Sequence, residues 1–158
     1  MIESSTYVSH CRLIAICNEC RYAMKHVKEG SCIINTTSVQ AYLRSPSSLE
    51  YQSTKGAIVA FTRGLTLELI HRGIRVNGVA PRPVWTLVQV VVQPEDKVTT
   101  LGSETPMDRD AQPHEIAPSY VFLASQDSLY YTAQVLHNNG AFYFVISFSN
   151  TLKYTSNP

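Results

Sequence analysis

The stretches CIINTT at residues 32–37 and IRVNGVA at residues 74–80 decide the fold. Both are short, apolar and rich in β-branched side chains, which is typical of strands buried on both faces of a sheet. Residues 47–72 between them are predicted to be helical, because an apolar side chain recurs every four residues, at Ala57, Phe61, Leu65 and Leu69. A strand, a helix and a strand in this order predict a parallel pair with a right-handed crossover.

The ends of these elements carry local signals. Ser47 and Glu50 have capping-box spacing, so the helix should begin there, and Gly73 should end it in the left-handed conformation. Pro113 suits the first position of another helix, and residues 134–137 are a candidate last strand. The order strand, helix, strand, helix, strand therefore predicts an α/β fold with a parallel sheet and right-handed crossovers. Residues 84–112 are expected to be irregular.

The first thirty residues are harder to interpret. Leu13 to Cys17 is a short apolar run that fits either a strand or a helix. Arg21 to Glu29 is compatible with a helix that ends at Gly30.

The composition excludes several classes of protein. The chain has 158 residues, of which 44% are hydrophobic and 16% charged, so one domain with a real core is expected. The net charge is +1 and the basic residues form no stripe, so no nucleic-acid partner is expected. Because no apolar run approaches about 18 residues, we expect no membrane span. We predict a soluble, cytoplasmic protein, with a plastid location as the alternative if a transit peptide precedes the chain.

Cys17 and Cys20 form a C-x-x-C motif, with His10 and His26 near them in the sequence. Such a group suggests a zinc site, and a metal-binding module is one hypothesis. Zinc sites of this kind usually need a second pair of ligands with similar spacing. We therefore predict no metal, and reduced structural cysteines.

Tyr51 and Lys55 are four residues apart at the start of the predicted helix. This spacing places both side chains on one face, with the ammonium near the phenol. A nearby positive charge stabilises the phenolate, which would let Tyr51 exchange a proton near neutral pH. An isolated pair of this kind is more often a surface tyrosine and a solvated lysine.

Ser38 follows the first strand, thirteen residues before Tyr51. Ligands of parallel α/β sheets bind at the carboxyl ends of the strands. A hydroxyl there can donate to a carbonyl oxygen that Tyr51 also protonates. The alternative is a serine that satisfies the loop backbone. Finding all three residues together by accident is far less expected than finding any one of them.

Five motifs resemble consecutive motifs of the short-chain dehydrogenase/reductase family. They are IINTTSV at 33–39, YQSTK at 51–55, RVNGVAP at 75–81, PVWT at 83–86 and APSYVFLAS at 117–125. The last two are similar to the subgroup of glucose and ribitol dehydrogenases and NADPH-dependent aldehyde reductases. The resemblance covers about residues 21–140. It implies the C-terminal part of a doubly wound Rossmann fold that lacks the first strands.

The resemblance also implies roles for individual residues. Ser38 would position the substrate carbonyl and Tyr51 would be the acid/base. Lys55 would stabilise the phenolate and bind the nicotinamide ribose of NADP or NAD. The remaining cofactor contacts would come from Pro81, the Val84 backbone and Thr86. The substrate would be an alcohol or carbonyl compound such as a sugar, polyol or small aldehyde.

The chain departs from the family pattern in two places that concern the cofactor. The family opens with a glycine-rich turn that holds the cofactor pyrophosphate at a helix N-terminus, and the seven glycines here are not clustered in that way. Arg82 also replaces a glycine usual in the family, and its side chain would either crowd the nicotinamide or point away.

The extent of the resemblance divides the chain into three parts. These are a poorly matching segment at 1–20, a partial Rossmann-like catalytic domain at 21–140 and an unrelated tail at 141–158.

Two main functional hypotheses follow. The first is an NADP(H)- or NAD(H)-dependent oxidoreductase. The second is a catalytically inactive, truncated fragment that associates with full-length relatives. Because an exposed apolar strand edge promotes association, we expect a homo-oligomer or association with related subunits. In the family such contacts commonly involve the helix that would lie at residues 49–72.

Overall fold

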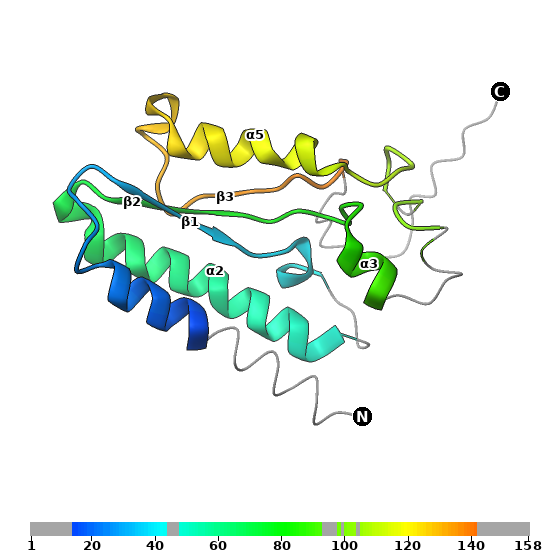
Figure 1. Ribbon diagram of the computed structural model, residues 1–158, viewed down its shortest axis with the longest axis horizontal. Coiled ribbons are helices and arrows are strands. Elements are labelled where there is room, and N and C mark those ends of the chain that lie inside the picture. The colour runs from blue at the N-terminus through cyan, green and yellow to red at the C-terminus, as the bar shows by residue number, and fades with distance from the viewer. Residues whose placement is uncertain (1–13, 44–47, 93–97, 99, 104, 142–158) are drawn as a thin grey trace, which may run out of the picture.

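The computed structural model describes residues 14–43, 48–92, 98, 100–103 and 105–141. A three-stranded parallel sheet lies at the centre of this part of the chain, in the order β1-β2-β3 (Figure 1). The strands are β1 (Cys32–Thr36), β2 (Arg75–Val79) and β3 (Val135–Leu136). This is the predicted α/β fold with part of a Rossmann-like sheet.

Helices cover both faces of the sheet (Figure 1). One face carries a helix at residues 14–23 and the long helix α2 (Leu49–Leu69), which continues into the 3₁₀ helix η3 (Ile70–Arg72). The other face carries α5 (Pro113–Ala124), followed by the 3₁₀ helix η4 (Gln126–Ser128). Coverage on both faces explains why the strands are apolar along their whole length rather than alternating.

Two apolar clusters form the core, one on each face of the sheet. The α2 side is built around Cys20, Leu65, Leu69, Ile74 and Val76, with Ile33 packed against them. The α5 side is built around Val79, Ile116 and Leu123, with Ile34 and Leu136 packed against them. Every residue of the central strand β2 is buried, whereas most of β1 is half-buried.

The local signals correctly predict most element ends. Gly73 adopts the left-handed conformation with φ of 65° after η3, and Pro113 begins α5. The start of α2 differs from the prediction, because its N-cap is Ser48 and no side chain caps it. Ser47 lies outside the described residues. The ambiguous apolar run near Cys17 is helical, and this helix ends at residue 23 rather than near Gly30.

Two expectations are wrong. Residues 84–112 are not wholly irregular, because Leu87–Val92 form the short helix α3.

The crossovers are not both right-handed. Both connections step along the sheet in the same direction, from β1 to β2 through α2 and from β2 to β3 through α5. Because α2 and α5 lie on opposite faces, the two crossovers have opposite hands and one is left-handed, against the general preference (Figure 1).

Replacing Ala133 with glycine is expected to raise the free energy of unfolding by about 1 kcal/mol. Ala133 has a φ of 58°, where a Cβ is strained, and its N–H donates to the Val76 carbonyl at 2.8 Å, which fixes that conformation. Urea unfolding would measure the change. The matched control is Ala60→Gly on the exposed side of α2, which should lower stability by about 1 kcal/mol. Equal effects at both sites would contradict this account.

No helix in the described ranges combines the length and the apolarity that a membrane span requires.

Candidate active site

Ser38 lies just beyond the carboxyl end of β1, as the N-cap of the 3₁₀ helix η1 (Val39–Ala41). Its backbone is extended and only 8% of the residue is exposed. The Ser38 Oγ accepts a hydrogen bond from the Gln40 backbone N at 3.2 Å. The local backbone thus occupies one lone pair of the hydroxyl, which leaves its hydrogen to be donated to another group.

Tyr51 and Lys55 lie one turn apart in the first part of α2, as predicted from their spacing. The Lys55 Nζ is 5.6 Å from the centre of the Tyr51 ring and donates to the Thr36 carbonyl at 3.1 Å. Tyr51 is 37% exposed, so its phenol is open to a ligand. The lysine therefore joins the end of β1 to the side chain of Tyr51.

Further hydrogen bonds hold the start of α2 against the end of β1. The Thr37 Oγ1 donates to the Lys55 carbonyl at 2.8 Å. The Gln52 Nε2 lies 3.1 Å from the Ser48 Oγ and 3.4 Å from the Gln40 Oε1, so it connects η1 with the first turn of the helix. The roles of Thr37 and Gln52 were not predicted from the sequence. The one sequence feature that indicates them is position, because Thr37 is next to Ser38 and Gln52 is next to Tyr51.

The segment after β2 approaches the same edge of the sheet. The Val39 backbone N donates to the Pro81 carbonyl at 3.2 Å, which joins the Ser38 loop to this segment. Val84 forms a parallel bridge with Ala111 and packs into the α5-side core. Thr86 is exposed and precedes α3. Pro81 thus adjoins the Ser38 loop directly, whereas Val84 and Thr86 follow it along the chain.

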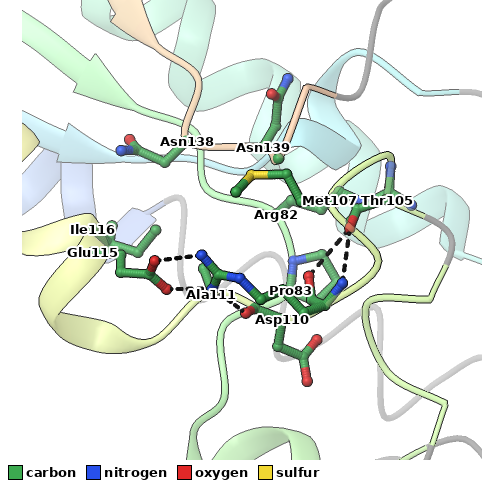
Figure 2. A pocket seen from close by; sticks show the side chains of 12 residues that line it. Arg82, Pro83, Thr105, Met107, Asp110, Ala111, Glu115, Ile116, Asn138 and Asn139 are labelled. Carbon is green, nitrogen blue, oxygen red and sulfur yellow. Dashed lines mark hydrogen bonds and ion pairs between the residues drawn. The ribbon is translucent and has the colours of Figure 1, made fainter.

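Arg82 lines a cavity of about 140 Å³ between the segment after β2, the loop before α5 and the turn at residues 138–140 (Figure 2). Its Nε and Nη1 atoms are buried, and Asp110 lines the same cavity. Burial raises the pKa of the Asp110 carboxyl. The sequence left two orientations open for the Arg82 side chain. In the structure this side chain lies in the wall of the cavity.

Glu115 pairs with Arg109 beside this cavity (Figure 2), and we expect acid to remove the stabilising effect of the pair. Both carboxylate oxygens accept from the guanidinium at 2.7 Å, and the Gln112 backbone N donates to Oε2 at 2.8 Å. The bonds from Arg109 and then from Gln112 lower the pKa of Glu115 from 4.5 to about 2.

The depressed pKa fixes the direction of the pH effect. The carboxyl of the unfolded chain takes up its proton first as the pH falls, so the contribution is complete above pH 4.5 and disappears between pH 4.5 and about 2. Urea unfolding of the wild type and of Glu115→Gln at several pH values would measure this. The two stabilities should converge in that range, and a constant difference down to pH 2 would argue against the role of the pair.

The described residues fit one side of a nicotinamide cofactor. The Tyr51 phenol, the Lys55 ammonium and the backbone after β2 gather where ligands of parallel sheets bind. The connections that leave β1 and β2 contain no glycine-rich turn leading into a helix within the described ranges. A pyrophosphate would therefore have to be held by groups outside this part of the structure.

Cys17 and Cys20 are free thiols on the helix at residues 14–23. Burial raises the pKa of Cys20, and the neighbouring Cys17 and Glu19 add to this. No group of three or more His, Cys, Asp or Glu side chains arranged to hold a metal ion occurs in the described part of the chain.

A family model described as enoyl-(acyl carrier protein) reductase matches residues 3–142. The glucose and ribitol dehydrogenase of Daucus carota is 62% identical over 120 residues, which are 76% of this chain and 41% of the relative. The NADPH-dependent aldehyde reductase 1, chloroplastic, of Arabidopsis thaliana is 61% identical over 121 residues, again 76% of this chain and 42% of the relative. The chain thus spans about two fifths of the length of these curated relatives.

Solved structures agree with the sequence relatives. A short-chain dehydrogenase family protein from Francisella tularensis superposes with a TM-score of 0.78 at 30% identity, covering 89% of this chain and 62% of that one. A short-chain dehydrogenase/reductase, glucose/ribitol dehydrogenase, from Brucella melitensis gives a TM-score of 0.70 at 34% identity, covering 78% and 50%. The fold and the family match define the class of protein, a chain with part of the Rossmann-like fold of short-chain dehydrogenases. The chain belongs to the short-chain dehydrogenase/reductase family, close to the glucose and ribitol dehydrogenases and NADPH-dependent aldehyde reductases.

Proposed function

We propose that this chain carries the proton-transfer side of an NADP(H)- or NAD(H)-dependent oxidoreductase that interconverts an alcohol and a carbonyl compound. The observation that supports this most strongly is the placement of Ser38 just after β1 and of Tyr51 and Lys55 at the start of α2, with the Lys55 ammonium hydrogen-bonded to the end of β1. The names of the relatives favour a sugar, a polyol or a small aldehyde as the substrate.

Each residue has a distinct role in the proposed reduction. The Tyr51 hydroxyl gives its proton to the carbonyl oxygen of the substrate, and the Ser38 hydroxyl donates a hydrogen bond to the same oxygen. The Lys55 ammonium stabilises the phenolate that remains. A bound nicotinamide supplies the hydride to the carbonyl carbon, so that one proton and one hydride complete the alcohol.

The same residues would hold the nicotinamide side of NADP or NAD. Tyr51 and Lys55 would contact the ribose, and Pro81, the Val84 backbone and the Thr86 hydroxyl would contact the nicotinamide. The exposed Thr86 and the exposed phenol of Tyr51 support this assignment. For the location we propose the cytoplasm, or the plastid by analogy with the chloroplastic relative.

A second candidate is a catalytically inactive chain that associates with related subunits. Two observations favour it. The strand β1 is the edge of the described sheet, and the described residues lack a glycine-rich turn for the pyrophosphate.

A fluorescence titration of the full chain with NADPH and with NADH tests the first candidate. We expect saturable but weak binding, because the described residues supply contacts to the nicotinamide side and none of the phosphate turn. Absence of binding of either cofactor at millimolar concentration would favour the second candidate for the isolated chain.

A further inference from the structure

The cavity beside Arg82 is separate from the candidate active site (Figure 2). It has a volume of about 140 Å³ and lies where the segment after β2, the loop before α5 and the turn at residues 138–140 meet. Ile116, one of its lining residues, belongs to the α5-side core. Tyr51 and Lys55 lie on α2, which covers the opposite face of the sheet. A ligand in this cavity would therefore contact groups other than those assigned to proton transfer.

Backbone hydrogen bonds hold the three walls of this cavity together. The Ala111 N–H donates to the Pro83 carbonyl at 3.2 Å, and the Trp85 N–H donates to the Ala111 carbonyl at 2.9 Å. The Arg82 N–H donates to the Asn138 carbonyl at 3.0 Å. The cavity is therefore formed before any ligand enters, as small-molecule sites usually are.

The loop that carries Asp110 has a compact backbone. Gly102 has a φ of 84°, and a Cβ at this position would overlap the backbone of Arg109 and Asp110. Only a glycine allows the two segments to approach so closely. The side chain of Thr105, which is buried, donates to the Gly102 carbonyl at 2.8 Å and lies 3.2 Å from the Arg109 carbonyl. These contacts fix the position of Asp110 in the wall of the cavity.

The Asp110 carboxyl is a group that a folded protein ordinarily avoids burying. Its Oδ1 atom is buried and accepts no hydrogen bond from the residues that the structure describes. Burial raises the pKa of the carboxyl, because the surroundings compensate its charge poorly. Without a donor, such a group destabilises the folded state. A ligand that brings a hydrogen-bond donor into the cavity would remove this cost.

Three other polar side chains of the wall already have partners within the protein. Both carboxylate oxygens of Glu115 accept from Arg109 at 2.7 Å. The Asn138 Nδ2 donates to the Ser119 Oγ at 2.8 Å. The Oδ1 atom of Asp110 is therefore the acceptor to which a ligand would bind.

The charge and the size of the cavity indicate the class of ligand. Two basic and two acidic side chains line it, namely Arg82, Arg109, Asp110 and Glu115. Because their formal charges cancel, a neutral ligand is favoured over an ion, whose burial would leave a net charge in the cavity. An apolar cavity of about 150 Å³ in another protein binds benzene, so this one has room for about six non-hydrogen atoms.

We propose that this cavity binds a small neutral polyol of about six non-hydrogen atoms, with one hydroxyl donating to the Oδ1 of Asp110. A hydroxyl group both donates and accepts, so a second hydroxyl can accept from the Arg82 guanidinium in the same wall. The carbon chain would lie against Pro83, Met107 and Ile116. The site is additional to the proposed oxidoreductase site and does not depend on it.

A titration of the isotope-labelled full chain with glycerol tests the proposal by nuclear magnetic resonance. We expect the amide signals of Asp110, Ala111 and Asn138 to shift and to saturate in the millimolar range, since so small a ligand binds weakly. Acetate and guanidinium, the matched ions, should give no saturable shift at these residues. A linear drift of signals along the whole chain would be a solvent effect only and would overturn the proposal, as would tighter binding of either ion.

Replacing Asp110 with alanine removes the proposed acceptor and should weaken glycerol binding at least about tenfold. Without glycerol, the Asp110→Ala chain should unfold at a higher urea concentration than the wild type, because a buried carboxyl without a donor has been removed. Asp127→Ala is the control, since Asp127 is exposed in η4, and should bind glycerol as the wild type does.

A second variant and a separate readout keep the outcomes distinct. Asp110→Asn keeps a carbonyl acceptor of similar shape and should bind glycerol with an affinity between those of the wild type and Asp110→Ala. Equal affinities of these three chains would contradict the assigned role of the carboxyl and with it the site. Because no arm of the experiment involves NADPH, a chain that binds glycerol but shows no turnover counts against the proposed oxidoreductase function alone.

Discussion

Replacing Tyr51 with phenylalanine is expected to lower turnover by about 10²–10⁴-fold, the usual contribution of a positioned acid/base. The substitution removes the phenolic oxygen and keeps the ring over which the Lys55 ammonium lies. The proton for the substrate oxygen then has no donor at this position. Because the ring and Lys55 are retained, NADPH should still bind, with an affinity lowered by no more than about tenfold for the loss of one hydrogen bond to the ribose.

The rate at which the full chain consumes NADPH with a small aldehyde would measure this effect. Tyr22→Phe is the control, since Tyr22 is an exposed tyrosine on the helix at residues 14–23. It should leave both turnover and affinity unchanged. A Tyr51→Phe chain that binds NADPH and works at the normal rate would remove the proposed role of this residue.

Replacing Arg75 with methionine should lower the free energy of unfolding by about 1–3 kcal/mol. The Arg75 guanidinium is buried and bonds to three acceptors, the carbonyls of Leu123 and Ser125 at 2.9 and 3.3 Å and the Ser128 Oγ at 3.0 Å. The carbonyls lie at the C-terminal end of α5, where a positive charge is favoured. A methionine fills a similar volume but removes all three bonds. The Ser128 hydroxyl lies 3.0 and 3.1 Å from the two carbonyls and can donate its single hydrogen to them, so the loss is only partly compensated.

Urea unfolding measures this loss directly. Arg63→Met on the exposed side of α2 is the control and should change stability by less than about 0.5 kcal/mol. Arg75→Lys should lie between the two, because an ammonium reaches fewer of the acceptors. A loss below about 1 kcal/mol for Arg75→Met would show that the three bonds contribute little.

The elements that follow local rules could be predicted from the sequence. The apolar, β-branched stretches predicted β1 and β2, and Gly73 and Pro113 marked the ends of two helices. Each of these signals depends on the residue itself or on its near neighbours. The spacing of Tyr51 and Lys55 likewise predicted a shared helix face, which the structure confirms.

Features that depend on contacts between distant segments could not be predicted. The acceptors of Arg75 lie about fifty residues further along the chain, so no neighbouring residue indicates that this arginine is buried. The direction of the Arg82 side chain depends on the loop at residues 105–111 and on the turn at 138–140. The hands of the crossovers depend on the faces that α2 and α5 cover, and the usual preference predicted one of them wrongly.

The strand β1 connects the fold with the proposed chemistry. Thr36, the last residue of this strand, offers the carbonyl that the Lys55 ammonium contacts. The same strand leads into Ser38. The position of β1 in the sheet therefore sets the positions of both Lys55 and Ser38.

The central claim is that this chain supplies the proton-transfer side of a short-chain dehydrogenase/reductase site. The most direct test is the rate at which the full chain consumes NADPH with a small aldehyde as the second substrate, compared with the rate of its Tyr51→Phe variant. The account predicts measurable consumption by the wild type and a rate about 10²–10⁴-fold lower for the variant. A wild-type chain that binds NADPH and consumes none of it would contradict the account.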